Sequence, residues 1–199
     1  MREKTRSECV IIGGGIIGLA IAAKLAKQGL AVIVLEAEKK TIQHASSHNS
    51  EVIHSGIYYK SESLKAKFCV EGNHLLYEYC HNKGIDYKRI GKLIIANDLN
   101  EKNALNKLFL NGIKNGVDGL SVINKREIIN KEPNLNAKYA IFSKTTGIID
   151  SHAFALSLEA EVENYGGHII LDSPVLDGFF NGTSWDLDVG GSSNCIINC

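Results

Sequence analysis

The feature that most constrains this chain is the apolar segment Val10–Ile12, which runs directly into the glycine-rich turn Gly13–Gly18. In a G-x-G-x-x-G turn the first glycine permits a tight bend and the second lets the backbone approach a pyrophosphate. The third allows a helix to pack closely on a sheet, and the N-terminal amides of that helix attract the anion. We therefore predict that Gly13, Gly15 and Gly18 bind the phosphates of a dinucleotide.

A glutamate closes the next predicted strand. Glu36 lies 18 residues after Gly18 and directly follows the apolar run Ala31–Leu35. A carboxylate at this place accepts hydrogen bonds from ribose hydroxyls and repels a 2′-phosphate. The segment therefore disfavours NADP, and by itself it does not separate FAD from NAD.

The same N-terminal segment is also similar to a secretory signal, because residues 9–23 carry no charge and follow a basic stretch. Glu3 and Glu8 interrupt that positive charge, and three consecutive glycines would weaken the helix of a signal. A membrane-spanning helix needs about 20 apolar residues, more than this segment offers. We interpret residues 9–23 as strand, turn and helix.

Charge and cysteine content exclude several classes of function. The 22 basic residues balance the 22 acidic ones, and no basic stripe interleaved with aromatic residues predicts a nucleic-acid partner. The five cysteines are odd in number and lack C-x-x-C spacing, which argues against a disulfide framework and fits reduced thiols in the cytoplasm. His44 and His48 stand four residues apart without a third ligand nearby, so we predict no metal site.

Hydrophobic periodicity predicts alternating helices and strands along the remaining chain. Helices are expected at 16–28, 63–83, 99–114, 125–130 and 151–165. Strands are expected at 31–35, 87–96, 120–123, 139–143, 147–150, 168–171, 175–180, 185–189 and 195–199, with Asn181-Gly182 as a hairpin turn. This pattern indicates an α/β fold.

A second set of motifs is far more specific than the glycine turn. Ser46–Tyr59 reads SSHNSEVIHSGIYY and Thr146–Asp150 reads TGIID. Further segments of the set are Ser63–Cys69, Leu76–Cys80, Gly91–Ile94, Asn115–Val117 and Glu132-Pro133. Together they strongly resemble the FAD-dependent L-2-hydroxyglutarate dehydrogenases and oxidases, which belong to the D-amino-acid-oxidase-like flavoproteins. Glu51 departs from the glycine that many members carry, and we interpret it as the mark of a subgroup.

The resemblance implies a Rossmann-type FAD-binding domain, assembled from separated segments, with an interleaved α+β substrate domain. Residues 1–85 and 150–199 are expected in the FAD-binding domain, and residues 86–149 in the first half of the substrate domain. Family members continue beyond the strand equivalent to Cys195–Cys199. Both domains are therefore expected to be C-terminally truncated.

The resemblance also implies FAD as the cofactor and assigns residues to it. Gly13, Gly15 and Gly18 would contact the pyrophosphate, Glu36 the adenosine ribose, and the backbone of Val175 the adenine. Ser46, Ser47, His48 and Asn49 would approach the pyrophosphate, the ribityl chain or the flavin. His54, Ser55 and Gly56 would lie beside the isoalloxazine ring.

The implied reaction is oxidation of a 2-hydroxy acid, with L-2-hydroxyglutarate giving 2-oxoglutarate. It requires hydride transfer to flavin N5, a base for the hydroxyl proton, and cations for the carboxylates. His54 is the best candidate for the base, since imidazole titrates near physiological pH; a histidine that only hydrogen-bonds the flavin or backbone is the alternative. Tyr58 and Tyr59 either line a pocket or pack, and we interpret Lys65 and Lys67 as a solvated helix face rather than as carboxylate anchors.

Three alternatives stay open. One is an amine or amino-acid oxidase of the same fold, and another is a truncated chain that binds FAD poorly and has little or no activity. An NAD-linked dehydrogenase shares the glycine turn but gives no reason for Ser46–Tyr59. Expected partners are a small 2-hydroxy acid, an electron acceptor at a membrane surface or in the respiratory chain, and a separate chain that supplies the C-terminal half.

Overall fold

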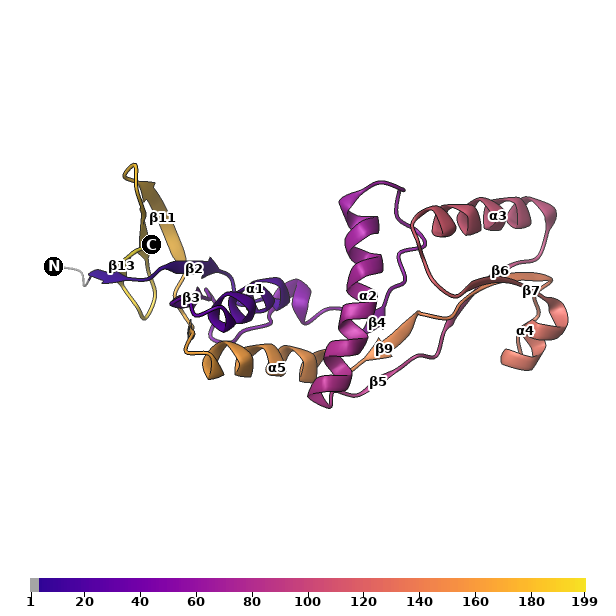
Figure 1. The fold of residues 1–199 in the computed structure, drawn as a ribbon, viewed down its shortest axis with the longest axis horizontal. Coiled ribbons are helices and arrows are strands. Elements are labelled where there is room, and N and C mark those ends of the chain that lie inside the picture. The colour runs from indigo at the N-terminus through magenta and orange to yellow at the C-terminus, as the bar shows by residue number, and fades with distance from the viewer. Residues whose placement is uncertain (1–3) are drawn as a thin grey trace. The chain divides into compact units, whose positions relative to one another are not determined.

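The computed structural model describes residues 4–199 and contains two compact units (Figure 1). Unit 1 combines Met1–Ser50 with Ser151–Cys199, and unit 2 is the continuous segment Glu51–Asp150. Arg2 and Glu3, part of the signal-like segment considered above, lie outside the described residues. Within residues 4–199, no helix is both long and apolar enough to span a bilayer.

Unit 1 contains a parallel sheet in the order β10 (His168–Ile170), β3 (Val32–Leu35), β2 (Cys9–Ile12). All four residues of β3 are buried, which explains why this strand is an unbroken apolar run. Helices α1 (Ile16–Lys27) and α5 (Ser151–Asn164) pack against each other, and α1 also contacts β2 and β3. Their buried positions are mostly small or aliphatic: Leu19, Ala22, Ala23 and Ala26 in α1, and Ala155, Leu158 and Val162 in α5.

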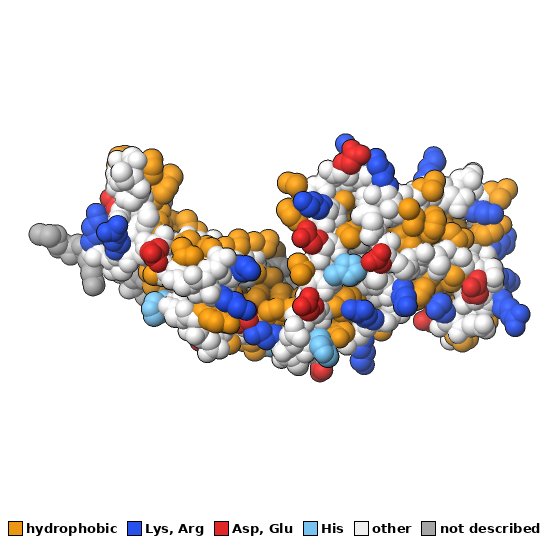
Figure 2. Space-filling model, viewed as in Figure 1, with side chains coloured by type: hydrophobic (Ala, Val, Ile, Leu, Met, Phe, Trp, Pro, Cys, Tyr) orange, Lys and Arg blue, Asp and Glu red, His pale blue; other side chains and the backbone are white. Residues whose placement is uncertain are grey.

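A second sheet of unit 1 has the order β1 (Lys4–Arg6), β13 (Cys195–Asn198), β12 (Trp185–Val189), β11 (Val175–Phe180). Strands β1 and β13 are parallel, and the other pairs are antiparallel. The two sheets share one core of five buried side chains, Ile33, Leu35, Leu187, Val189 and Ile197. Figure 2 shows further hydrophobic side chains on the surface, over α1 and along the hairpin that contains β11.

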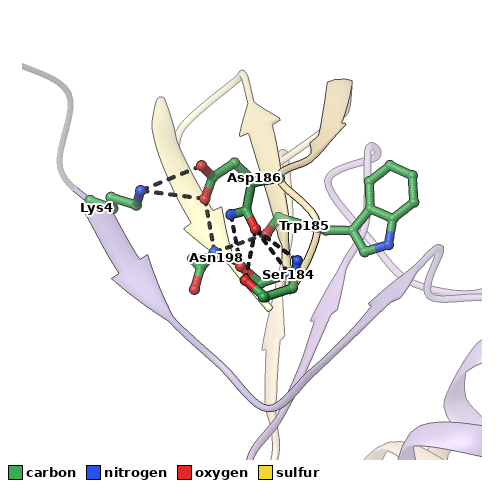
Figure 3. A network of polar contacts seen from close by, with 7 residues as sticks. Lys4, Ser184, Trp185, Asp186 and Asn198 are labelled. Atoms are coloured by element: carbon green, nitrogen blue, oxygen red, sulfur yellow. Dashed lines mark hydrogen bonds and ion pairs between the residues drawn. The ribbon is translucent and has the colours of Figure 1, made fainter.

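Polar side chains connect three strands of this second sheet (Figure 3). The Asn198 side-chain amide donates to Ser184 Oγ at 2.8 Å and to Asp186 Oδ1 at 2.9 Å. Lys4 Nζ lies 3.4 Å from Asp186 Oδ1, so β1, β12 and β13 are joined through one carboxylate.

Unit 2 contains two antiparallel sheets of three strands each. The first has the order β4 (Val52–Ile53), β9 (Gly147–Ile149), β5 (Tyr87–Lys88), and the second β6 (Lys92–Ala96), β8 (Tyr139–Ser143), β7 (Leu120–Asn124). Its helices are α2 (Leu64–Lys83), α3 (Leu99–Lys114) and α4 (Lys125–Lys131). Ser63, Asp98 and Asn124 cap the three helices with their side chains, as residues of these types do at helix N-termini.

The five predicted helices are confirmed, and so is the hairpin at residues 175–189, whose loop spans 181–184. The single strand predicted over 87–96 is wrong, because the structure divides it into β5 and β6 in different sheets. The break falls at Gly91, whose φ of +74° is left-handed and where a Cβ would lie 2.3 Å from Phe142. The short strands β1 and β4 and a 3-10 turn, His44–Ser46, were not predicted.

The compact units differ from the expected domains at residues 51–85, which belong to unit 2 rather than to unit 1. The reason is local bonding: β4 pairs with β9, and Asn73 and Tyr77 of α2 both donate to the Thr145 carbonyl at 3.0 Å. Near residue 150 the division falls one residue later than expected. Which unit binds cofactor and which binds substrate stays a prediction.

Candidate functional site

The glycine turn has the geometry that its sequence predicts. Gly13 has a φ of +103°, and its amide donates to the Leu35 carbonyl at 2.8 Å. A Cβ at Gly18 would lie 2.0 Å from the Gly13 carbonyl oxygen, so α1 packs against the turn at a distance that only glycine permits. The N-terminal amides of α1 are thus brought to the carboxyl end of β2, where they attract an anion.

Glu36 lies beside this turn, at the end of β3, with 9% of its surface exposed. One carboxylate oxygen accepts from the Gly14 amide at 2.7 Å, and the other from the Glu38 amide at 2.9 Å. An ionised carboxylate has about four acceptor positions, so these two bonds leave capacity for ribose hydroxyls. Glu36 is therefore held in place by backbone groups before any ligand arrives.

Two of the four polar residues at 46–49 connect their loop to helix starts. Ser46 Oγ accepts from the Ile16 amide at 3.2 Å, and a Cβ at Gly15 would lie 3.0 Å from that oxygen. The Asn49 side-chain amide donates to the Ser46 carbonyl at 3.0 Å and to Ser151 Oγ at 3.2 Å, where α5 begins. The structure thus brings Ser46 to the glycine turn, as a phosphate-binding role requires.

Ser47 and His48 instead bond within their own turn. Ser47 Oγ donates to the His44 carbonyl at 2.9 Å, and His48 Nδ1 lies 2.8 Å from the same oxygen. Both side chains are exposed. His44 pairs with Glu38 at 3.1 Å, and among residues 4–199 no three His, Cys, Asp or Glu side chains form a metal-binding group.

Val175 begins β11 and pairs with Val189. It lines an apolar cavity of about 520 Å³ together with Val10, Ile12 and Trp185, among others. The predicted contact of its backbone with adenine stays a prediction.

His54 follows β4 in unit 2, and its backbone is fixed from α2. Its carbonyl accepts from the Asn73 side-chain amide at 3.0 Å and from Cys69 Sγ at 3.6 Å, while its imidazole reaches the surface. Partial burial, and then the positive charges of Lys92 and Lys65, lower the pKa of His54 below its usual 6.5. The imidazole is therefore mostly neutral at pH 7 and able to accept a proton.

The loop after His54 is held by Asn111 of α3 and by Asn115, the cap residue at the C-terminal end of this helix. The Asn111 amide donates to the carbonyls of Ile57 at 2.8 Å and Tyr59 at 2.9 Å. The Asn115 amide donates to the carbonyls of Gly56 at 3.1 Å and Tyr59 at 2.9 Å. Four hydrogen bonds to backbone carbonyls, from α3 and its cap residue, thus fix the loop that carries both tyrosines.

A buried set of hydroxyls lies beneath the same loop. Ser143 Oγ donates to Ser55 Oγ at 3.0 Å and lies 3.0 Å from Thr146 Oγ1. Residues 54–59, Lys92 and Thr146 line a small recess above these groups. The sequence motifs contained Ser55 and Thr146 but gave no sign that Ser143 joins them.

The model of the FAD dependent oxidoreductase family matches residues 8–199. The chain belongs to the FAD-dependent oxidoreductase family. This match confirms the expected cofactor class. The glycine turn suits an FAD pyrophosphate, because the close approach of α1 that Gly18 permits places the amides at the start of this helix, which attract phosphate, at the turn.

Curated relatives of this chain include mitochondrial L-2-hydroxyglutarate dehydrogenases. The protein of Pongo abelii is 48% identical over 172 residues, which cover 85% of this chain and 41% of the relative. The Homo sapiens protein is 48% identical over 170 residues, covering 84% of this chain and 37% of the relative. The chain thus spans about two fifths of the length of these relatives.

Solved structures of the same fold support the α/β, Rossmann-type assignment. The L-α-glycerophosphate oxidase of Mycoplasma pneumoniae, solved with FAD bound, has a TM-score of 0.89 at 24% identity, covering 97% of this chain and 52% of its own. Glycine oxidase of Geobacillus kaustophilus has a TM-score of 0.82 at 22% identity, and the match covers 94% of this chain and 52% of the oxidase chain. At these identities the likeness establishes the fold alone.

Proposed function

We propose that this chain forms the cofactor site and part of the substrate site of an enzyme that oxidises L-2-hydroxyglutarate to 2-oxoglutarate. The observation that carries this proposal is 48% identity to L-2-hydroxyglutarate dehydrogenases over 85% of the chain. The activity is proposed for the chain together with a polypeptide that corresponds to the remaining length of its relatives, on the same chain or on a separate one.

In this proposal the glycine turn holds the FAD pyrophosphate. The first-turn amides of α1 and the positive end of its dipole face the phosphates, and Ser46 positions the start of that helix through the Ile16 amide. Glu36 accepts the ribose hydroxyls with the acceptor positions that Gly14 and Glu38 leave free. Bound FAD supplies the hydride acceptor of the reaction.

His54 acts as the base for the substrate hydroxyl. An imidazole with a lowered pKa is neutral at pH 7 and has a free nitrogen lone pair that takes up the hydroxyl proton. The bonds from Asn73 and Cys69 to its carbonyl fix the backbone from which the ring projects. The positive charges of Lys92 and Lys65 would stabilise the substrate alkoxide that forms as the hydroxyl proton leaves.

The test is turnover by a full-length protein that contains this chain. We expect reduction of an artificial electron acceptor with L-2-hydroxyglutarate, and little with the D-enantiomer, glycine or D-amino acids. Turnover of glycine or D-amino acids alone would overturn the proposal in favour of an amine or amino-acid oxidase. That alternative has the same fold support, since glycine oxidase has a TM-score of 0.82 with this chain.

The electron acceptor and the cellular location belong to the same proposal. We propose an acceptor at a membrane surface or in the respiratory chain, as the family resemblance implies, and a cytoplasmic location, as the cysteine content favours. Spectroscopic oxidation of the reduced enzyme by a soluble quinone, and fractionation of cells, test the two points separately.

A further inference from the structure

Two lysines lie near His54, and each lies over one of two consecutive tyrosines that line the recess. Lys92 itself lines the recess, whereas Lys65 lies beside it. Lys92 Nζ lies 4.7 Å from the centre of the Tyr58 ring. Lys65 Nζ lies 4.7 Å from the centre of the Tyr59 ring. An ammonium group at this distance is attracted to the face of an aromatic ring, so each tyrosine helps to orient one cation.

The framework around these cations is well ordered by bonds within unit 2. Lys92 pairs with Ser143 across β6 and β8, and the neighbouring Gly91 amide donates to the Thr146 carbonyl at 2.9 Å. Lys65 lies in the first turn of α2, which Ser63 caps. The tyrosines are fixed through Asn111 and Asn115, as described above. The two cations are therefore carried by a strand and a helix rather than by a free loop.

The recess has an unbalanced positive charge. No carboxylate is among its lining residues, and within residues 4–199 neither Lys65 nor Lys92 has an acidic partner at ion-pair distance. Both charges reach the imidazole, because both lower the pKa of His54. An anion bound here would relieve that repulsion when His54 takes up a proton.

The size of the recess limits what can enter it. Its cavity volume is about 10 Å³, which holds about one water molecule. A dicarboxylate bound at this recess would therefore lie across its mouth, with at most one oxygen inside. Lys92 is half-buried and lines the recess with His54, whereas Lys65 is exposed.

We propose that Lys92 binds the carboxylate next to the reacting carbon and that Lys65 binds the distal carboxylate of the same dicarboxylate substrate. This inference rests on the proposed function, and it makes Lys65 the residue that distinguishes dicarboxylates from monocarboxylates. It differs from the interpretation of Lys65 as a solvated helix face, because it gives the exposed ammonium group a ligand.

The experiment compares L-2-hydroxyglutarate with L-2-hydroxyvalerate, which lacks the distal carboxylate, in a full-length protein that contains this chain. A charge-assisted hydrogen bond contributes enough for its loss to raise KM about 10- to 100-fold. We expect Lys65→Ala to raise the KM of L-2-hydroxyglutarate by this factor and to leave the KM of L-2-hydroxyvalerate unchanged. Lys92→Ala should raise KM for both substrates, and Lys92→Arg should restore part of the loss.

Lys67→Ala is the matched control, because Lys67 is an exposed lysine on the same helix that lies over Phe68. Unlike Lys65, it contacts no tyrosine of the recess and is not among the charges that lower the pKa of His54. Binding of glutarate, measured by calorimetry, gives a readout that does not need turnover. Glutarate affinity should fall in Lys65→Ala and stay unchanged in Lys67→Ala. Both variants should keep the melting temperature of the wild type, so that a loss of affinity does not reflect unfolding.

The outcomes separate the two proposals. An active wild type whose Lys65→Ala variant keeps its KM and its glutarate affinity would overturn the lysine assignment and leave the proposed function standing. A wild type that binds glutarate through Lys65 but does not oxidise L-2-hydroxyglutarate would overturn the proposed function and retain the dicarboxylate site.

Discussion

The Glu36 carboxylate accepts a hydrogen bond of 2.7 Å from the Gly14 amide, which ties the end of β3 to the glycine turn. We expect Glu36→Ala to leave two amides, those of Gly14 and Glu38, without their acceptors and to cost about 1–3 kcal/mol of unfolding free energy. Urea unfolding measures this loss. Glu36→Gln keeps one acceptor and should cost less, and equal stability of both variants with the wild type would contradict the assignment.

Gly18 is the position where a side chain is least tolerated. A Cβ there would lie 2.0 Å from the Gly13 carbonyl oxygen, so Gly18→Ala must displace α1 or the turn, at a cost of about 1–3 kcal/mol. We also expect weaker FAD binding, measured by flavin fluorescence. Gly72→Ala, where nothing lies within 4 Å, is the control and should leave stability unchanged or slightly raised.

The fall in enzyme activity at low pH should reflect protonation of His54. Because its pKa is lowered, the base stays deprotonated and active to a pH below 6.5, and activity falls as the pH drops further. Lys92→Met removes a positive neighbour and should raise the pKa of His54, shifting this fall in activity to higher pH. Histidine NMR titration checks the pKa without turnover; a value above 6.5 in the wild type would refute the argument.

Asn111 is predicted to position the loop that carries Tyr58 and Tyr59. Asn111→Ala leaves one donor fewer for the carbonyls of Ile57 and Tyr59, so we expect a loss of about 1–3 kcal/mol and a higher KM. Asn106→Ala on the exposed side of the same helix is the control. If both variants behave alike in thermal unfolding and kinetics, the loop does not depend on Asn111.

The 199-residue polypeptide produced alone should bind FAD poorly and self-associate. Large apolar side chains are exposed in unit 1, with Ile17 at 78%, Ile12 at 64% and Leu176 at 61%. Exposed apolar patches of this kind favour association. Size-exclusion chromatography with light scattering measures self-association, and the visible spectrum measures bound flavin. A monomer that binds one FAD per chain would contradict this prediction.

The parts of the fold that could be predicted from sequence depend on neighbours in the chain. The turn at Gly13–Gly18 combines strand, glycines and helix within ten residues, and the structure agrees with it. The break at Gly91 could not be predicted, because it depends on the ring of Phe142, which is remote in sequence. Local alternation of apolar residues gives no information about such a contact.

Contacts between residues remote in sequence also explain why parts of the candidate site could not be predicted. Periodicity correctly places Lys65 on the exposed side of α2, yet its position over Tyr59 depends on bonds from Asn111 and Asn115, in α3 and at its end. The contact of Ser143 with Ser55 likewise joins residues 88 positions apart. Recognising these groups from sequence alone requires knowing which segments meet.

Unit 1 is assembled from both ends of the chain, whereas unit 2 is continuous, and this has a consequence for biosynthesis. Unit 2 precedes β10 to β13 in the chain, so we expect it to be able to fold before the second half of unit 1 is available. Its Ile149 amide donates to the Glu51 carbonyl at 3.0 Å, which holds the two points where the chain enters and leaves unit 2 close together. Once unit 2 has folded, the entropy of closing its 100-residue loop is already met, so this unit should assist the pairing of the two ends of the chain in unit 1.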